Sequence, residues 1–109
     1  MVGRVPSESP VEAQLALMLA LRLRHQREAV GLTQETAAER ARISRNHYQL
    51  LESGYSDRAK GTPANPRLST LFDLAHALDC TVVDLISGLA QPAVIEAHTA
   101  VDDSTRPKR

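Results

Sequence analysis

The chain has 109 residues, which is enough for one small domain with tails and leaves no room for a second domain. Aromatic residues make up only 3% and tryptophan is absent, which argues against a ring-walled ligand pocket or a platform that stacks single-stranded bases. The formal net charge is zero, so composition alone gives no sign of a polyanionic partner.

The distribution of charge along the chain is uneven. Between Arg22 and Arg67 there are nine basic and five acidic residues, a net charge of +4. Residues 68–109 hold six acidic and three basic residues, a net charge of −3. This segregation indicates a positive face in the middle of the chain that the total conceals.

Cysteine, histidine and hydropathy exclude several kinds of site. Cys80 is the only cysteine, so the chain forms no internal disulfide and no multi-cysteine zinc site. The four histidines are dispersed without ligand spacing, and we expect no metal. The apolar run at residues 15–21 is too short to span a bilayer and lacks a signal-peptide cleavage site. We therefore expect a cytoplasmic protein with no membrane contact.

A long helix is predicted near the start of the chain. Residues 1–9 are polar and contain a proline, and we expect a flexible arm there. Pro10 suits the first helical position and Glu12 the first turn, which predicts a helix from about residue 10 to Val30, stopped by Gly31.

The first half of that helix is apolar on every face, whereas a solvent-facing helix carries a single apolar stripe. Either the domain covers both sides of it or a second subunit covers one. The small size of the domain favours the second subunit. The candidate dimer interface consists of Leu15, Leu17, Leu19 and Leu21.

Two short capped helices follow. Thr33 and Ser44 are N-cap residues, and Gly54 is a C-cap that tolerates positive φ. Small alanines keep the first of these helices thin, and Ile43 is expected to fill the corner between them. The pattern predicts two helices joined at a sharp turn between residues 33 and 54.

The rest of the chain predicts a loop, two helices and a tail. Residues 55–67 are rich in Gly, Pro and turn residues and are predicted to be a loop. Residues 68–78 have helical spacing of apolar residues, with Ser69 as cap, and Thr81 to Gly88 form a short fifth helix. We expect an all-α, five-helix domain at residues 10–89 and a disordered tail at residues 90–109.

The second capped helix carries the candidate site. Tyr48 and Leu51 are spaced to face inward, which leaves Arg45, Asn46 and Gln49 outward, with His47 to one side. Arginine can pair bidentately with guanine, and Asn or Gln with adenine. The same groups on a merely solvated helix face are the plainer alternative.

These residues resemble the lambda repressor and Cro-like, or Xre, helix-turn-helix family. The resemblance runs from about Leu21 to Gly88 and is carried by REAVGLTQE at 27–35, ISRN at 43–46, LESG at 51–54, NPRLSTL at 65–71 and LAHAL at 74–78. It implies a lambda-repressor-like domain that binds double-stranded DNA.

The resemblance also implies roles for individual residues. Gln34 would hold a phosphate and support the recognition helix, which Ser44 caps. Arg27 and Glu52 would form an internal salt bridge. The bases would be contacted by Arg45, Asn46 and Gln49, with His47 beside them, and the DNA backbone by Arg58, Lys60 and Arg67.

Three positions depart from the family pattern. Arg42 replaces the usual corner glycine, where positive φ is often needed. Ala37 replaces a common leucine and leaves room that Tyr48 can fill. The connection after Gly54 is longer than usual and carries Arg58 and Lys60, so we expect it to embrace DNA.

The expected function is a transcriptional regulator, a repressor or autoregulator, that acts as a homodimer on a palindromic operator in a bacterial or phage setting. The alternative is an antitoxin-type module that neutralises a partner toxin through its terminal segments; polymerase is another possible partner. No nucleophile motif, phosphate-binding glycine loop or paired carboxylate is present, so we expect neither an enzyme nor a cofactor.

Overall fold

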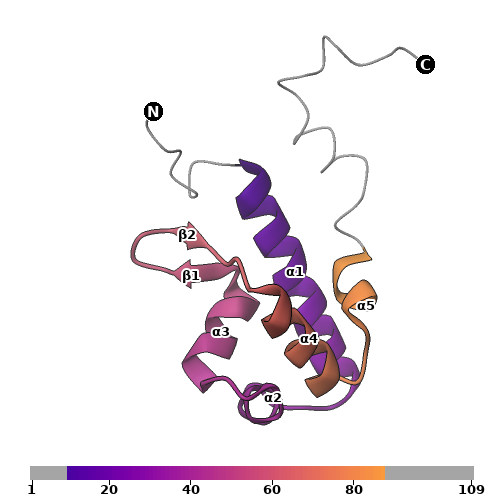
Figure 1. Cartoon of the computed structure of the whole chain (residues 1–109). Helices are drawn as coiled ribbons and strands as arrows, with labels where there is room; N and C mark the ends of the chain where they lie inside the picture. Colours follow the sequence, from indigo (N-terminus) through magenta and orange to yellow (C-terminus); the bar gives the residue numbers. More distant parts are fainter. Residues whose placement is uncertain (1–9, 88–109) are drawn as a thin grey trace, which may run out of the picture.

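The computed structural model describes residues 10–87, and the predicted arm at 1–9 and tail at 90–109 lie outside the described residues. The described part contains five helices and a small hairpin (Figure 1). In chain order the elements are α1 (Pro10–Ala29), α2 (Gln34–Ala41), α3 (Arg45–Ser53), β1 (Tyr55–Asp57), β2 (Thr62–Pro63), α4 (Leu68–Ala77) and α5 (Val82–Ile86).

The helix boundaries follow from local capping chemistry. The Thr33 hydroxyl accepts a hydrogen bond from the Thr36 amide at the start of α2, and the Ser44 hydroxyl accepts one from the His47 amide at the start of α3. At α5 the side chains of Thr81 and Asp84 form a reciprocal capping box. These caps satisfy amides that the helices themselves leave without a partner.

The predicted cap at α4 is wrong. Arg67, in extended conformation, is the last residue before the helix, and it makes no side-chain cap hydrogen bond. Ser69 lies in the first turn of α4 instead of before it. The helix therefore begins at Leu68, two residues earlier than a cap at Ser69 would place it.

The predicted loop at residues 55–67 contains an antiparallel hairpin, so the fold is mostly α with a two-stranded sheet. Tyr55 pairs with Pro63, and Asp57 pairs with Thr62, with an irregular register between them. The Ala64 amide donates to the Gly54 carbonyl at 2.9 Å and joins the end of the hairpin to the end of α3. Strands of three and two residues are too short for a sequence pattern to show.

The core lies between the long helix α1 and the remaining helices. Figure 1 shows α1 running through the domain, with α3 and α5 on different sides of it. The largest fully buried side chains of the core are Tyr48, Leu23, Leu74, Leu78 and Leu85. Burying each of these leucines contributes about 1.5–3 kcal/mol to folding.

The four leucines of the predicted dimer interface differ in how far they are exposed. Leu19 is buried in the core of its own protomer and is not available to a partner, so that assignment is wrong. Leu15 is half-buried beside the hairpin. Leu17 and Leu21 are 53% and 63% exposed. The helix turns by about 100° per residue, so leucines two residues apart lie on opposite sides of it, and the core covers only one of those sides.

Two kinds of feature are absent from residues 10–87, a membrane-spanning helix and a metal-binding cluster. Within that range, no helix is long and apolar enough to cross a membrane. Nor does the same range contain a group of three or more His, Cys, Asp or Glu side chains that could hold a metal ion.

Candidate nucleic-acid interface

The turn between α2 and α3 depends on a residue with positive φ. Arg42 lies in the left-handed region at φ 62°, and its amide donates to the carbonyls of Ala38 and Glu39. The turn therefore has the conformation that glycine provides at low cost, adopted here by arginine. Ile43 follows and packs half-buried against the core.

Helix α3 has an inward and an outward face. Tyr48, Leu51 and Glu52 are buried, and the two apolar side chains belong to the core cluster. The predicted reading residues lie on the other side: Arg45, Asn46 and His47 are exposed, and Gln49 is half-buried. Ser44, the N-cap, is also exposed, so the N-terminal half of α3 presents polar side chains outward.

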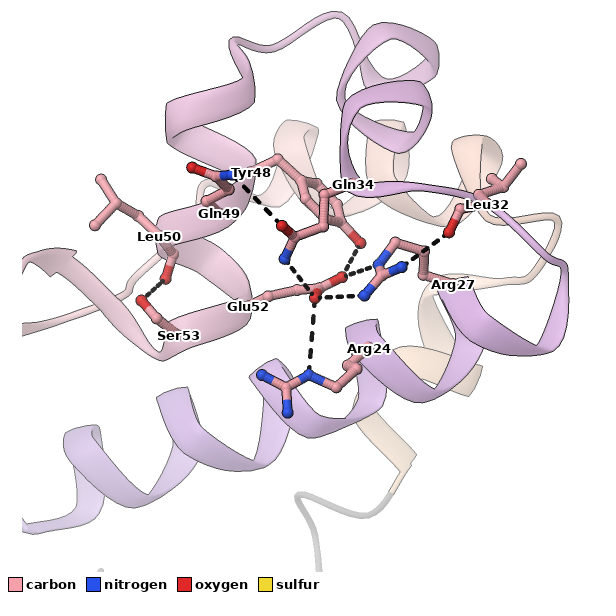
Figure 2. Close-up of polar contacts among 9 residues, drawn as sticks. All are labelled: Arg24, Arg27, Leu32, Gln34, Tyr48, Gln49, Leu50, Glu52 and Ser53. Atoms are coloured by element: carbon pink, nitrogen blue, oxygen red, sulfur yellow. Dashed lines mark hydrogen bonds and ion pairs between the residues drawn. The ribbon is translucent and has the colours of Figure 1, made fainter.

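The buried carboxylate of Glu52 joins three helices (Figure 2). Arg27 of α1 donates to both carboxylate oxygens, from Nε at 2.6 Å and from Nη2 at 3.1 Å. Gln34 of α2 donates at 3.0 Å, and the Tyr48 hydroxyl of α3 donates to the same carboxylate. The side chain of Glu52 is only 1% exposed, so these contacts replace water around the charge.

These contacts shift the pKa values of the two acidic groups involved. Burial by itself raises the pKa of Glu52, but the hydrogen bonds from Arg27, Tyr48 and Gln34 outweigh it and leave the pKa below its ordinary value. Burial, followed by the hydrogen bond to Glu52, raises the pKa of the Tyr48 phenol. Glu52 is therefore ionised and Tyr48 is a neutral donor at neutral pH.

Gln34 connects this buried cluster to the outward face of α3. Its amide nitrogen donates to Glu52, and its amide oxygen accepts a hydrogen bond from Gln49 at 3.5 Å. Both ends of the Gln34 amide thus contact the protein and hold Gln49 in place. The phosphate contact that the resemblance implies for Gln34 stays a prediction.

The predicted backbone contacts are spread over the surface. Arg58 and Lys60 are exposed in the turn between β1 and β2, where the Lys60 amide donates to Asp57. Arg67 is exposed at the start of α4. Arg58 lines an open pocket with Gln34, Gln49 and a residue that the sequence did not suggest, Arg24 of α1. The available signal was its position one helical turn before Arg27.

The fold and this site define a class of protein. Two capped helices meet at a sharp turn, and the second presents amide and guanidinium groups outward from a braced position, which is the arrangement of a DNA-binding helix-turn-helix protein. Residues 23–85 match the family model HTH_3, helix-turn-helix, and the chain belongs to that family of Xre and lambda-repressor-like DNA-binding regulators.

A solved structure shares the fold. The crystal structure of the clp gene regulator ClgR from Corynebacterium glutamicum is similar, with a TM-score of 0.54 and 24% sequence identity. The likeness covers 86% of this chain and 96% of that one. Comparison with curated protein sequences finds no significant match.

Proposed function

We propose that this protein is a sequence-specific transcriptional regulator that binds double-stranded DNA as a homodimer on a palindromic operator, as a repressor or autoregulator. The observation that carries the proposal is the outward row on α3. Arg45, Asn46 and Gln49 project from a helix that is capped by Ser44 and joined to α1 and α2 through its buried Glu52. Reading bases requires donors and acceptors in fixed positions, and this support provides them.

The chemistry of the row matches base edges in the major groove. Arg45 can donate two hydrogen bonds to guanine, and Asn46 and Gln49 can each pair bidentately with adenine. Each such pair discriminates against a wrong base by about 1–3 kcal/mol. Backbone contacts by Gln34, Arg58, Lys60 and Arg67 would set the register without reading sequence.

A dimer is proposed because one recognition helix reads only a few base pairs. Useful specificity needs two half-sites about one helical turn apart, which two copies related by a two-fold axis provide. The outer face of α1 supports this part, since Leu17 and Leu21 lie one helical turn apart and remain exposed in the protomer. A bound dimer would then cover a promoter.

The test begins with selection of bound sequences from a random DNA pool. Replacing Arg45, Asn46 and Gln49 by Ala should reduce binding to the selected site to the level of unrelated DNA. The melting temperature should hardly change, because these side chains lie outside the core. A matched control replaces three exposed polar residues of α4, Ser69, Asp73 and His76, and should keep specificity.

Two results would contradict the proposal. Specific binding retained by the triple variant would place the reading surface elsewhere. Recovery of the protein only as a complex with a different chain, with no DNA preference, would favour a protein-binding module.

A further inference from the structure

An open pocket lies where α1, α2, α3 and the hairpin turn meet. It is lined by Arg24 of α1, Gln34 of α2, Gln49, Glu52 and Ser53 of α3, and Arg58 of the turn. Two arginines that are far apart in the sequence therefore line one pocket. Neither is needed to bury apolar surface, since both residues are exposed.

The charge in this pocket is positive. Glu52 is its acidic residue, and that carboxylate is already held by Arg27 at 2.6 Å and by two neutral donors. Arg24 adds only a long contact, with its Nε 3.9 Å from Glu52, and its side chain is 52% exposed. In Figure 2 the terminal nitrogens of Arg24 point away from Glu52. Those nitrogens and the Arg58 guanidinium leave the pocket with a net positive charge, which suits an anionic ligand.

The pocket continues the reading face of α3. Arg45, Gln49 and Ser53 lie at intervals of four residues, so they share one side of the helix. Gln49 and Ser53 lie on this side and also line the pocket. An anion in the pocket would therefore lie directly beside whatever α3 reads.

We propose that Arg24 and Arg58 form a clamp for one backbone phosphate of the DNA strand that borders the groove read by α3. This inference rests on the proposed function, which already gives Arg58 a backbone contact, and adds Arg24 of α1 as a second ligand of the same phosphate. Guanidinium groups suit phosphate because their planar N–H pairs match its oxygens. The contact positions the protein on the duplex and reads no bases.

The first experiment measures the salt dependence of binding by the full chain to the selected duplex. A variant with Arg24→Gln and Arg58→Gln should lower the slope of log K against log salt by about 1.8, which is about 0.9 for each of the two phosphates that a dimer contacts. This change in slope corresponds to about a thirtyfold loss of affinity at 0.15 M salt. The ratio of selected to unrelated DNA should not change.

Arg22→Gln is the matched control. Arg22 lies on the same helix but points to the other side, where its guanidinium donates to the Asp84 carbonyl of α5. This variant loses one positive charge, half of what the clamp variant loses, and should keep the wild-type slope. If it lowers the slope by half as much as the clamp variant does, the effect is one of net charge and the clamp is wrong.

The second experiment removes charge from the DNA. Single phosphates in the selected duplex are replaced in turn by uncharged methylphosphonate. One position on each half-site should weaken binding of the wild-type protein and have no further effect on the clamp variant. If the methylphosphonate at each position lowers the affinity of the wild-type protein and of the clamp variant equally, Arg24 and Arg58 contact no phosphate.

The two proposals fail separately. If the α3 triple variant loses specificity but the clamp variant binds as wild type at all salt concentrations, only the clamp is wrong. If the wild-type protein selects no sequence, the proposed function itself is wrong.

Discussion

The carboxylate of Glu52 lies almost fully buried among donors from α1, α2 and α3. Removing an ion from water costs several kcal/mol. Nearby partners offset this cost only when they hydrogen-bond to all the lone pairs of the buried carboxylate. Here Arg27, Gln34 and Tyr48 supply those partners, and no buried side-chain polar atom within residues 10–87 lacks a hydrogen bond. Glu52 thus fixes the position of α3 relative to the other two helices.

Replacing Glu52 by Gln should destabilise the protein by about 3 kcal/mol, because Arg27 then keeps a mostly buried charge without its partner. Urea denaturation at neutral pH measures this. The exposed Glu39→Gln is the control and should cost less than about 0.5 kcal/mol.

The pH dependence of stability should also change. The pKa of folded Glu52 lies below its ordinary value of 4.5, so the stabilisation is fully present above that value and is lost as pH falls through the lowered folded pKa. Urea denaturation in that acid range should show a smaller loss of stability for Glu52→Gln than for wild type. Equal acid losses in both proteins would show that Glu52 does not carry this dependence.

At the scale of elements, the turn between α2 and α3 sets the angle at which the recognition helix leaves the domain. Its C-cap, Arg42, has φ 62°, which costs a residue with a β-carbon about 1–2 kcal/mol relative to glycine. The Arg42 side chain is exposed and contributes a positive charge to this face.

Replacing Arg42 by Gly should stabilise the fold by about 1 kcal/mol, since relief of the backbone strain outweighs the greater freedom of glycine in the unfolded chain. Thermal or urea denaturation measures the gain. Arg42→Ala removes the same side chain but keeps the β-carbon, and it should give no gain. An equal gain from Ala would assign the effect to the side chain and contradict the strain argument.

The sequence predicted some elements more accurately than others. The ends of α2 and α3 were predicted from Thr33, Ser44 and Gly54 because a cap contacts residues within one turn of itself. The hairpin was missed because its pairing depends on residues 55–63 folding back together over very short strands. The start of α4 was misjudged because a hydroxyl near a helix end is common and need not cap it.

At the scale of the molecule, α1 has a core face and an outer face. Leu19 packs into the core with Leu23, whereas Leu17 and Leu21 remain outside. Leu17 lies close to Gly54, so that it also covers the end of α3. Leu21 is therefore the cleaner position at which to test a partner surface.

Leu21→Glu should weaken homodimerisation at least tenfold, because a carboxylate in an apolar interface leaves a charge without water or a partner. Analytical ultracentrifugation measures the dimer affinity, and the melting temperature of the monomer should be unchanged. Leu68→Glu on α4 is the control, because Leu68 is 66% exposed against 63% for Leu21. If Leu21→Glu sediments as wild type does, the outer face of α1 is not the interface.

By itself the sequence determined the five helices, most of their caps and the outward row Arg45, Asn46 and Gln49, because each depends on residues within a few turns of one another. Only the tertiary structure decided which leucines of α1 face the core, and only it brought Arg24 and Arg58 to one pocket. The physical reason is that both depend on how α1 packs against α3 and the hairpin. Packing between distant segments leaves no periodic trace in the chain.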